Sequence, residues 1–317
     1  MLGLGLGLQK STKLGGFIGL LDLVPNAAAA YSLRLLRKNY SGGLVRVRAW
    51  DGLANQGEAD VMAYHVSSTE YVLDLNSTLE DLDATAIGRG LTTSDTLADL
   101  VSTGVNDYDG LTSSWYDQSL SNDATQSAGA SQPKIVSGGS LVTENGKPAV
   151  DFDGVDDVLV KSNPTGMPTG QQARSFFVAL KSYLPSSSAR DYLSIGDGGT
   201  SSDLKKWRLV AEWSVRIFGD SVIYNTILQN THYLSTNIYN GGTISSNNFY
   251  ENGVLQSGTG GTSIPNTSAG NLYIGKYPSI INGFDGAIQE LIIYSSDQSS
   301  NRAAIETNIN TFYSIYL

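Results

Sequence analysis

The chain has 317 residues, of which 40% are hydrophobic and 16% are charged, against the roughly 25% charged residues of an average domain. Its formal net charge is −10 and its pI is about 4.6. Nucleic acid is therefore excluded as a non-specific partner, because phosphate binding needs clustered Lys and Arg. The chain has no cysteine and only two histidines, which excludes disulfides, thiolate metal sites and a histidine-rich zinc site.

The chain begins with leucines that alternate with glycines, at Leu2, Leu4, Leu6 and Leu8. This period of two predicts an extended arm over residues 1–20 with one apolar edge. The segment lacks a basic stretch before its apolar run, and glycines interrupt that run, so it fits neither a signal peptide nor a membrane span. We expect the four leucines to contact a neighbouring subunit, which implies a homo-oligomer; packing on the chain's own domain is the alternative.

Residues 21–145 are predicted to form a helix and several strands. A helix is expected to begin at Pro25 and Asn26, to continue through four alanines and to end at Gly42 and Gly43. Strands are expected over residues 44–50, 61–66 and 70–75, and a short helix over residues 97–101. A basic group in this region indicates ordinary surface charge, with a local acidic partner as the alternative; it comprises Arg34, Arg37, Lys38, Arg46 and Arg48.

Residues 146–317 show the alternation and turn residues of many short strands. The Asn145–Gly146 and Asn252–Gly253 pairs are strong turn signals. Long strands are expected over 174–183 and over the FDGAIQELIIYS segment, and a final helix with Ile305, Ile309 and Phe312 on one face. About a dozen strands with turns every 8–12 residues predict an all-β jelly-roll sandwich with a short helix near each end. The turn at Asn145 is the best candidate for a boundary between residues 21–145 and residues 146–317.

The segments PAVDFDGVDDVLV, FYENGVLQ and YIGKYPSIINGFDGAIQELIIYSSDQSS resemble the laminin-G-like, concanavalin-A-like jelly roll. The front segments AYSLRLLRKNYSGGLVRVR, WYDQSLSNDATQ and QPKIV resemble the catalytic domain of B-type α-L-arabinofuranosidases. A similar layout recurs in fibre and decoration proteins of phage virions. Together the resemblance covers residues 20–317 and implies the fold, while the fold itself hosts lectins, hydrolases and structural modules.

The arabinofuranosidase resemblance implies two catalytic carboxylates, and both of their positions are changed here. The nearest nucleophile candidate is Glu212, but Trp213 occupies the family's position, and a shift of one residue turns a strand side chain to the other face. Tyr277 stands where the family has its acid, and Asp285 is a nearby carboxylate in the FDG turn. Because both positions depart, we expect the chain not to be an enzyme, with a diverged glycosidase as the alternative.

The stretch WYDQSLSNDATQ allows two interpretations. Asp117 and Ser119 can hydrogen-bond nearby backbone amides in a structural turn, which is the favoured interpretation. The resembling enzymes carry this motif at their sugar pocket, so Trp115, Tyr116 and Asp117 are candidate glycan contacts. Tyr277 is the best exposed aromatic candidate for a sugar, because a tyrosine ring is rigid and its hydroxyl is polar.

A run of aspartates lies in DFDGVDD. Calcium takes six to eight oxygen ligands, so Asp153, Asp156 and Asp157, with Asp151, are candidate ligands. The run lacks the longer loop of a calcium hand, and capping of turns by these carboxylates is the favoured interpretation. No other cofactor is expected.

These observations predict a structural component of a phage virion, a head-decoration or fibre protein that displays a lectin-like jelly roll. Its expected partners are other virion proteins, which the arm would contact, further copies of the chain itself, and a cell-surface glycan. A trimer is implied only by the resemblance to fibre proteins. The expected location is the virion. A secreted carbohydrate-binding protein or an arabinofuranosidase-like glycosidase is the alternative.

Overall fold

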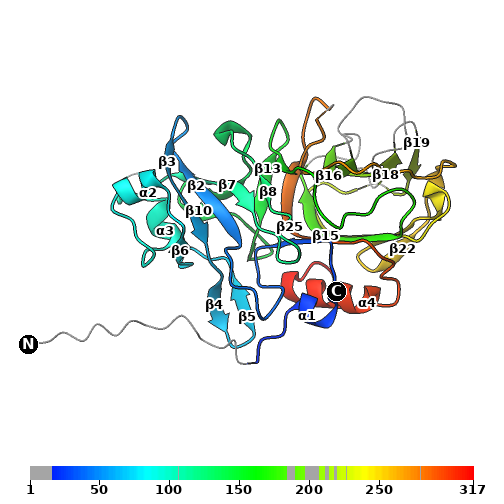
Figure 1. The fold of residues 1–317 in the computed structure, drawn as a ribbon, viewed down its shortest axis with the longest axis horizontal. Helices are drawn as coiled ribbons and strands as arrows, with labels where there is room; N and C mark the ends of the chain where they lie inside the picture. The colour runs from blue at the N-terminus through cyan, green and yellow to red at the C-terminus, as the bar shows by residue number, and fades with distance from the viewer. Residues whose placement is uncertain are drawn as a thin grey trace, which may run out of the picture.

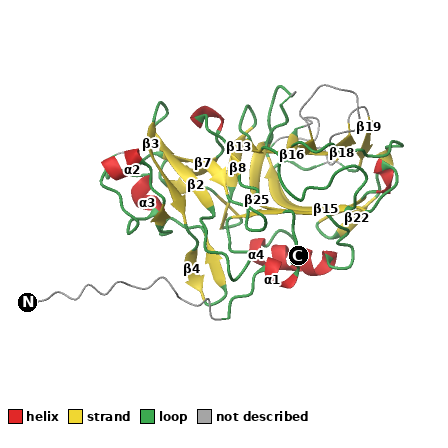
Figure 2. Ribbon diagram, in the orientation of Figure 1, coloured by secondary structure: helices red, strands yellow, loops and turns green. Residues whose placement is uncertain are grey.

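The computed structural model describes residues 16–105, 107–183, 190–196, 207–210, 214–217, 220–225, 227–278 and 280–317. The predicted arm leucines Leu2, Leu4, Leu6 and Leu8 lie outside the described residues. The fold is almost entirely antiparallel β-structure (Figure 2). Four α-helices occur in the described part of the chain, namely α1 (Leu20–Leu23), α2 (Ala84–Gly88), α3 (Leu97–Leu100) and α4 (Arg302–Tyr313).

One long sheet runs through the whole molecule, with the early strands at one side of Figure 1 and the jelly roll at the other. Pairing gives its order as β6 (Leu79–Glu80), β3 (Asn55–Val61), β2 (Val45–Trp50), β7 (Asp109–Trp115), β9 (Lys134–Ser137), β13 (Val150–Asp153), β25 (Asp285–Tyr294), β15 (Arg174–Ser182), β20 (Thr231–Tyr239), β21 (Asn248–Glu251) and β22 (Val254–Gln256). The second half of β25 pairs with β1 (Ala29–Ser32), and β9 also pairs with β10 (Ser140–Leu141).

A second layer lies against the jelly-roll half of this sheet. Its order is β8 (Ala124–Thr125), β14 (Leu159–Lys161), β24 (Asn271–Ile274), β16 (Asp191–Gly196), β17 (Trp207–Val210), β18 (Ser214–Ile217), β19 (Asp220–Ile223) and β23 (Thr259–Gly260). Two small hairpins stand apart, β4 (Tyr64–Ser67) with β5 (Glu70–Val72) and β11 (Thr143–Glu144) with β12 (Lys147–Pro148). The prediction of an all-β sandwich is confirmed.

The central strand β15 shows why the sandwich needs helices on its outer face. Phe176 and Val178 point into the core between the two layers, whereas Phe177 and Ala179 point the other way. Both faces are buried, so the strand reads as a continuous apolar run. Helix α4 covers the outer face with Ile305 and Ile309, and α1 packs in the same cluster (Figure 1). The predicted final helix is therefore confirmed.

The predicted helix over residues 25–42 is wrong. Residues 29–32 form β1 instead and pair with β25 from Ala29 opposite Ile293 to Ser32 opposite Glu290. All four residues of β1 are buried. Alanine favours helices, but here small side chains are needed because the strand is covered on both faces. Tertiary packing thus overrides the local preference, and the first helix, α1, lies before Pro25.

Both Asn–Gly turns are confirmed. Asn145 and Gly146 have φ of 49° and 71° and join β11 to β12, and Asn252 and Gly253 have φ of 52° and 78° and join β21 to β22. Left-handed backbone at two successive positions is the type I′ hairpin turn that Asn–Gly favours.

Candidate active site

The WYDQ stretch is a buried structural turn. Asp117 is 4% exposed, and its carboxylate accepts hydrogen bonds from the backbone N–H groups of Ala30, Ser119, Leu120 and Asn122 and from the Ser119 hydroxyl. Gln118 is also buried and hydrogen-bonds the backbone at the end of β1 and just after it, at residues 32, 34 and 36. The motif therefore ties β1 to the end of β7, and Asp117 has no free face for a sugar.

The aromatic candidates differ in exposure. Trp115 is fully buried in the core. Tyr277 is 1% exposed and packs edge-on against Tyr273, so the expectation that Tyr277 is exposed is wrong. Tyr116 is half-buried and donates from its hydroxyl to Asp60 at 2.6 Å. Among these three, only Tyr116 presents part of its ring to solvent.

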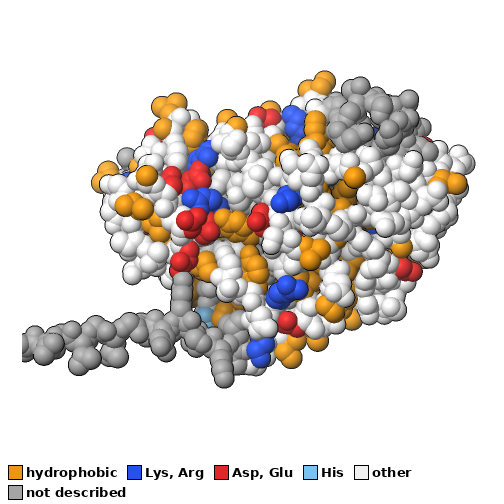
Figure 3. Space-filling model, viewed as in Figure 1, with side chains coloured by type: hydrophobic (Ala, Val, Ile, Leu, Met, Phe, Trp, Pro, Cys, Tyr) orange, Lys and Arg blue, Asp and Glu red, His pale blue; other side chains and the backbone are white. Residues whose placement is uncertain are grey.

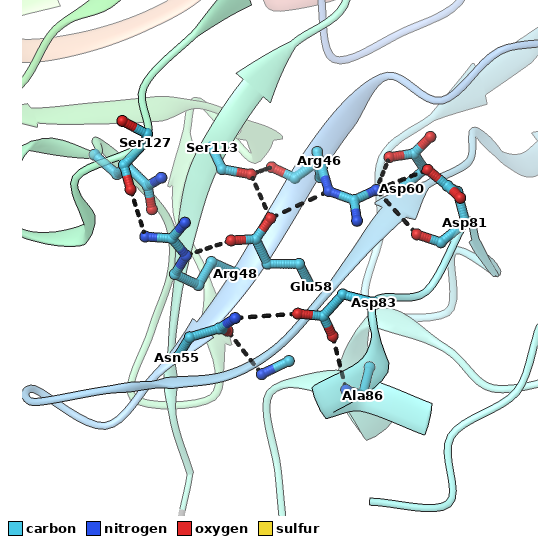
Figure 4. Close-up of polar contacts among 12 residues, drawn as sticks. Arg46, Arg48, Asn55, Glu58, Asp60, Asp81, Asp83, Ala86, Ser113 and Ser127 are labelled. Carbon is cyan, nitrogen blue, oxygen red and sulfur yellow. Dashed lines mark hydrogen bonds and ion pairs between the residues drawn. The ribbon is translucent and has the colours of Figure 1, made fainter. Parts of the chain in front are cut away.

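Two arginines of the basic group, Arg46 and Arg48, are paired with carboxylates inside the molecule (Figure 4). Arg46 on β2 bonds Glu58 at 3.1 Å, Asp60 at 2.8 Å and Asp81 at 3.2 Å, and Arg48 pairs with the other oxygen of Glu58. Figure 3 shows acidic and basic side chains intermixed on this side of the molecule. Because each guanidinium is already matched by carboxylates, this face is a stabilising ion-pair network and does not offer free charge to an acidic partner.

A pocket of about 340 Å³ lies where the early strands meet the jelly roll. Strand pairing builds it: Trp50 faces Asp109 across β2 and β7, Leu111 faces Lys134 across β7 and β9, and Lys134 faces Asp151 across β9 and β13. Strand β13 and the turn after it add Asp153 and Asp157. The lining residues are Trp50, Gly52, Asp109, Leu111, Gly129, Ala130, Gln132, Lys134, Ser137, Asp151, Asp153 and Asp157.

Asp151 is a half-buried carboxyl in this pocket with an elevated proton affinity. Burial raises its pKa to about 6, the negative charge of Asp285 adds to the rise, and the ammonium of Lys134 opposes it. Its Oδ1 has no hydrogen-bond partner within the described residues. Lys134 pairs with Asp109 at 2.8 Å, so its charge is shared between two carboxylates and neutralises neither completely.

Asp157 is more deeply buried, with 4% of its surface exposed. Burial raises its pKa to about 7, and the negative charges of Asp153, Asp156 and Asp151 also raise it. The hydrogen bond from the Asp153 N–H lowers this pKa but does not outweigh the other causes. The Asp153 N–H donates to its Oδ2 at 2.9 Å. Since that oxygen accepts a hydrogen bond, the acid proton belongs on Oδ1.

The predicted calcium ligands lie close together. Carboxylate oxygens of Asp153, Asp156 and Asp157 are all within 4.8 Å of one another. Two of them cap the local turn: Asp153 accepts from the N–H groups of Val155 and Asp156, and Asp157 accepts from the Asp153 N–H. Asp156 instead accepts from the Ser131 hydroxyl. The capping that the sequence favoured is therefore present, and calcium stays a prediction.

The catalytic candidates from the resemblance fall in different places. Glu212 lies outside the described residues. Asp285 begins β25 directly opposite Asp153, and burial raises its pKa while Arg190 opposes the rise. It stands beside the pocket, where its charge acts on Asp151. The sequence interpretation missed Trp50, Asp109, Gln132 and Lys134, because only the pairing of β2, β7, β9 and β13 brings them together.

No family model matches the chain, and no curated protein matches it. Solved structures do match. A GH54 α-L-arabinofuranosidase soaked with a cyclic sulfate inhibitor has a TM-score of 0.60 at 14% identity, over 94% of this chain and 65% of that one. An arabinofuranosidase complexed with arabinofuranosyl-α-1,2-xylobiose has a TM-score of 0.55 at 16% identity, over 89% and 62%. The chain thus spans just under two thirds of the length of these enzymes.

The prediction that the chain is not an enzyme is contradicted by these two structures, because both proteins share its fold along most of its length and both are arabinofuranosidases. At such identities the likeness establishes the fold. Within the described residues, each helix is also too short or too polar to cross a membrane.

Proposed function

We propose that the chain is a glycoside hydrolase whose acidic pocket cleaves a glycosidic bond, with Asp157 as the proton donor and Asp151 as the ionised partner. The observation that carries this proposal is the pair of carboxyls with raised pKa on one pocket of about 340 Å³. Glycoside hydrolysis commonly uses two carboxyl groups in opposite protonation states.

The two pKa values assign the roles. With a pKa of about 7, Asp157 still carries its proton for about half of the time at neutral pH, so it can protonate a leaving oxygen. With a pKa of about 6, Asp151 is mostly ionised under the same conditions, and it can act on the sugar or on water. A pKa close to the working pH is the value that suits each task.

The other lining residues suit a sugar. Trp50 is half-buried and forms one wall, and a partly exposed aromatic ring of this kind stacks on the apolar face of a sugar ring. Gln132 is buried, and its Oε1 has no partner within the described residues, so it can accept a hydrogen bond from a sugar hydroxyl. The Lys134–Asp109 pair adds charged donors and acceptors at the rim.

The test is hydrolysis of nitrophenyl glycosides, beginning with the 4-nitrophenyl α-L-arabinofuranoside that was soaked into a structural neighbour and continuing through other neutral sugars. Asp157→Asn and Asp151→Asn should each lower kcat/KM by about 10²–10⁴-fold, the usual contribution of general acid–base catalysis. Asp81→Asn is the matched control, because this carboxylate is 81% exposed and pairs with Arg46 away from the pocket. Full activity in both pocket variants would refute the proposal, and glycan binding without cleavage would leave a carbohydrate-binding protein.

The homo-oligomer and the partner proteins remain predictions that rest on residues 1–20, and the virion location remains a prediction that rests also on the resemblance to phage proteins. Light scattering of the full chain and of a chain that begins at residue 21 tests the role of residues 1–20 in assembly. A folded monomer after truncation of an oligomeric full chain would support an assembly arm, and identical masses would refute it.

A further inference from the structure

A groove of about 790 Å³ lies beside helix α4 and takes no part in the proposed hydrolysis. One wall is the outward face of α4, with Ala304, Thr307 and Phe312. The other walls come from α1 and the residues just before it, from the hairpin of β4 and β5, and from the segment after β1. Figure 1 shows α1 and α4 together on the same side of the molecule. We call this hollow the α4 groove. Among the described residues, it shares no lining side chain with the acidic pocket.

The walls of the α4 groove are apolar and uncharged where they face solvent. Ile18 and Leu23 are each 62% exposed, and both line the groove. Helix α4 carries two charged residues, Arg302 and Glu306, and they pair with each other. The outward face of α4 is therefore uncharged, whereas an exposed helix face ordinarily carries charged residues. Contiguous apolar surface of this kind marks a place where another chain binds.

The charged groups that reach the α4 groove are already paired. Arg34 bonds both oxygens of Glu290, and its guanidinium lies 4.6 Å from the centre of the Phe312 ring. Lys147 pairs with Glu70. Among the described lining residues, no cation or carboxylate is left unmatched for a charged ligand. The occupant that suits this groove is therefore apolar and neutral.

The leucine–glycine run at residues 2–8 has this character. It contains no charged side chain, and its leucines alternate with glycines. In an extended backbone the leucines would share one edge and repeat every 6.6–6.8 Å or so, at about 3.3–3.4 Å per residue. On the α4 wall, Ala303, Thr307 and Thr311 follow one another at four-residue steps, which is about 6 Å along a helix. The two repeats are close enough for successive leucines to pack against successive turns of α4.

The position of Gly16 favours the leucines of a second copy over those of the same chain. Gly16 directly precedes Phe17, which lines the groove, and residues 9–15 separate Gly16 from Leu8. Fully extended, residues 9–15 span about 23 Å, which exceeds the length of about 18 Å that α4 has as a helix of 12 residues. Laid along its own groove, the chain would cover α4 with the polar residues 9–13 and carry its leucines past the end. A second copy can lay its leucines on α4 directly.

We propose that the α4 groove receives residues 2–8 of a second copy of this chain, so that the arms hold the copies together. Exchange of arms between two copies closes the assembly and fills every groove, and so does a ring in which each arm passes to the next copy. The proposal is independent of the hydrolase function, because the groove and the acidic pocket are built from different residues.

Light scattering of the full chain over a series of concentrations tests the groove. Leu6→Ala should raise the dissociation constant of the assembly by about 10–100-fold, the worth of one buried leucine side chain. Thr307→Glu places a charge on the exposed face of α4 and should raise it by about 10-fold or more. Thr85→Glu is the matched control, because Thr85 is an exposed threonine on another helix, α2, and it should change nothing. A wild-type chain that stays monomeric, or an assembly that Thr307→Glu leaves intact, would overturn the proposal.

A cysteine cross-link identifies the occupant. Because the chain has no cysteine, Leu6→Cys can be introduced in one preparation of the full chain and Thr307→Cys in another. Mixed and oxidised, the two should form a disulfide that joins one chain of each kind, identified by mass spectrometry, and Thr85→Cys in place of Thr307→Cys should form far less of it. Cross-linking only within a chain that carries both Leu6→Cys and Thr307→Cys would show that each arm fills its own groove. No cross-link in either case would show that residues 2–8 do not occupy it. Either result would overturn the proposal.

Discussion

Replacement of Asp157 by asparagine should stabilise the fold in a manner that depends on pH. In the folded chain the pKa of Asp157 is raised from its ordinary value of 3.8 to about 7, chiefly by burial. Asparagine keeps the shape and can still accept from the Asp153 N–H, so the two proteins should be equally stable below about pH 4, where the aspartate is protonated in both states.

The sign above pH 4 follows from proton linkage. As the pH rises, the unfolded aspartate ionises first while the folded one keeps its proton, so the wild-type free energy of unfolding falls relative to that of Asp157→Asn. The difference between the two free energies of unfolding grows by about 1.4 kcal/mol per pH unit up to the folded pKa and then stays at about 4 kcal/mol. Asp157 is almost fully buried, so solvent screening reduces this value little.

Urea denaturation of both proteins between pH 3.5 and 8.5 measures this difference. Asp83→Asn is a control of opposite sign. Burial tends to raise the pKa of Asp83, but hydrogen bonds from Ala86, Glu58 and Asn55 outweigh it and lower the pKa. That variant should lose stability at neutral pH, and the loss should vanish as the pH falls. A stability difference for Asp157→Asn that does not change with pH would refute the reasoning about its buried charge.

Three further substitutions test the architecture by chemical denaturation. Asp117→Ala leaves several buried N–H groups without an acceptor and should cost about 3–5 kcal/mol; a loss below about 1 kcal/mol would show that the WYDQ turn is not a structural anchor. Glu290→Gln should cost about 3–5 kcal/mol because it strands Arg34, which bonds both oxygens of Glu290 at 2.8 and 2.9 Å in a buried pair; a neutral effect would contradict this. Gly154→Ala should cost more than Gly138→Ala, since both positions have positive φ but only at Gly154 would the new Cβ lie 2.6 Å from another atom, Asp285 Cβ; equal losses would contradict the close approach.

Local sequence signals predicted those parts of the fold that depend on neighbouring residues. The apolar run in RSFFVALKSY and the Asn–Gly pairs predicted β15 and both type I′ turns, since their causes lie within a few residues. The four alanines after Asn26 led to the wrong prediction of a helix. Alanine favours helices, but its small side chain also fits a strand that is packed against other parts of the chain on both faces. Only the pairing of β1 with β25, more than 250 residues away, decides between the two.

The candidate site was predictable only in part. The aspartates of DFDGVDD were visible in the sequence, but their ordinary interpretation is turn capping, and capping does occur. What makes them chemically distinctive is the burial of Asp157 and the approach of Trp50, Asp109 and Lys134 through three successive strand pairings. Tyr277 shows the converse, because a tyrosine after an Ile–Gly pair is not marked in the sequence as buried.

The measurement that tests the central claim most directly is the pH dependence of kcat/KM for the wild-type chain on the best glycoside found. The account predicts a bell-shaped profile, in which activity falls below about pH 6 as Asp151 takes up a proton and above about pH 7 as Asp157 loses one. Each variant should keep a low residual activity whose pH profile lacks one limb: the acid limb in Asp151→Asn and the alkaline limb in Asp157→Asn. A profile whose two limbs persist unchanged in both variants would contradict the assignment of the acidic pocket as the active site.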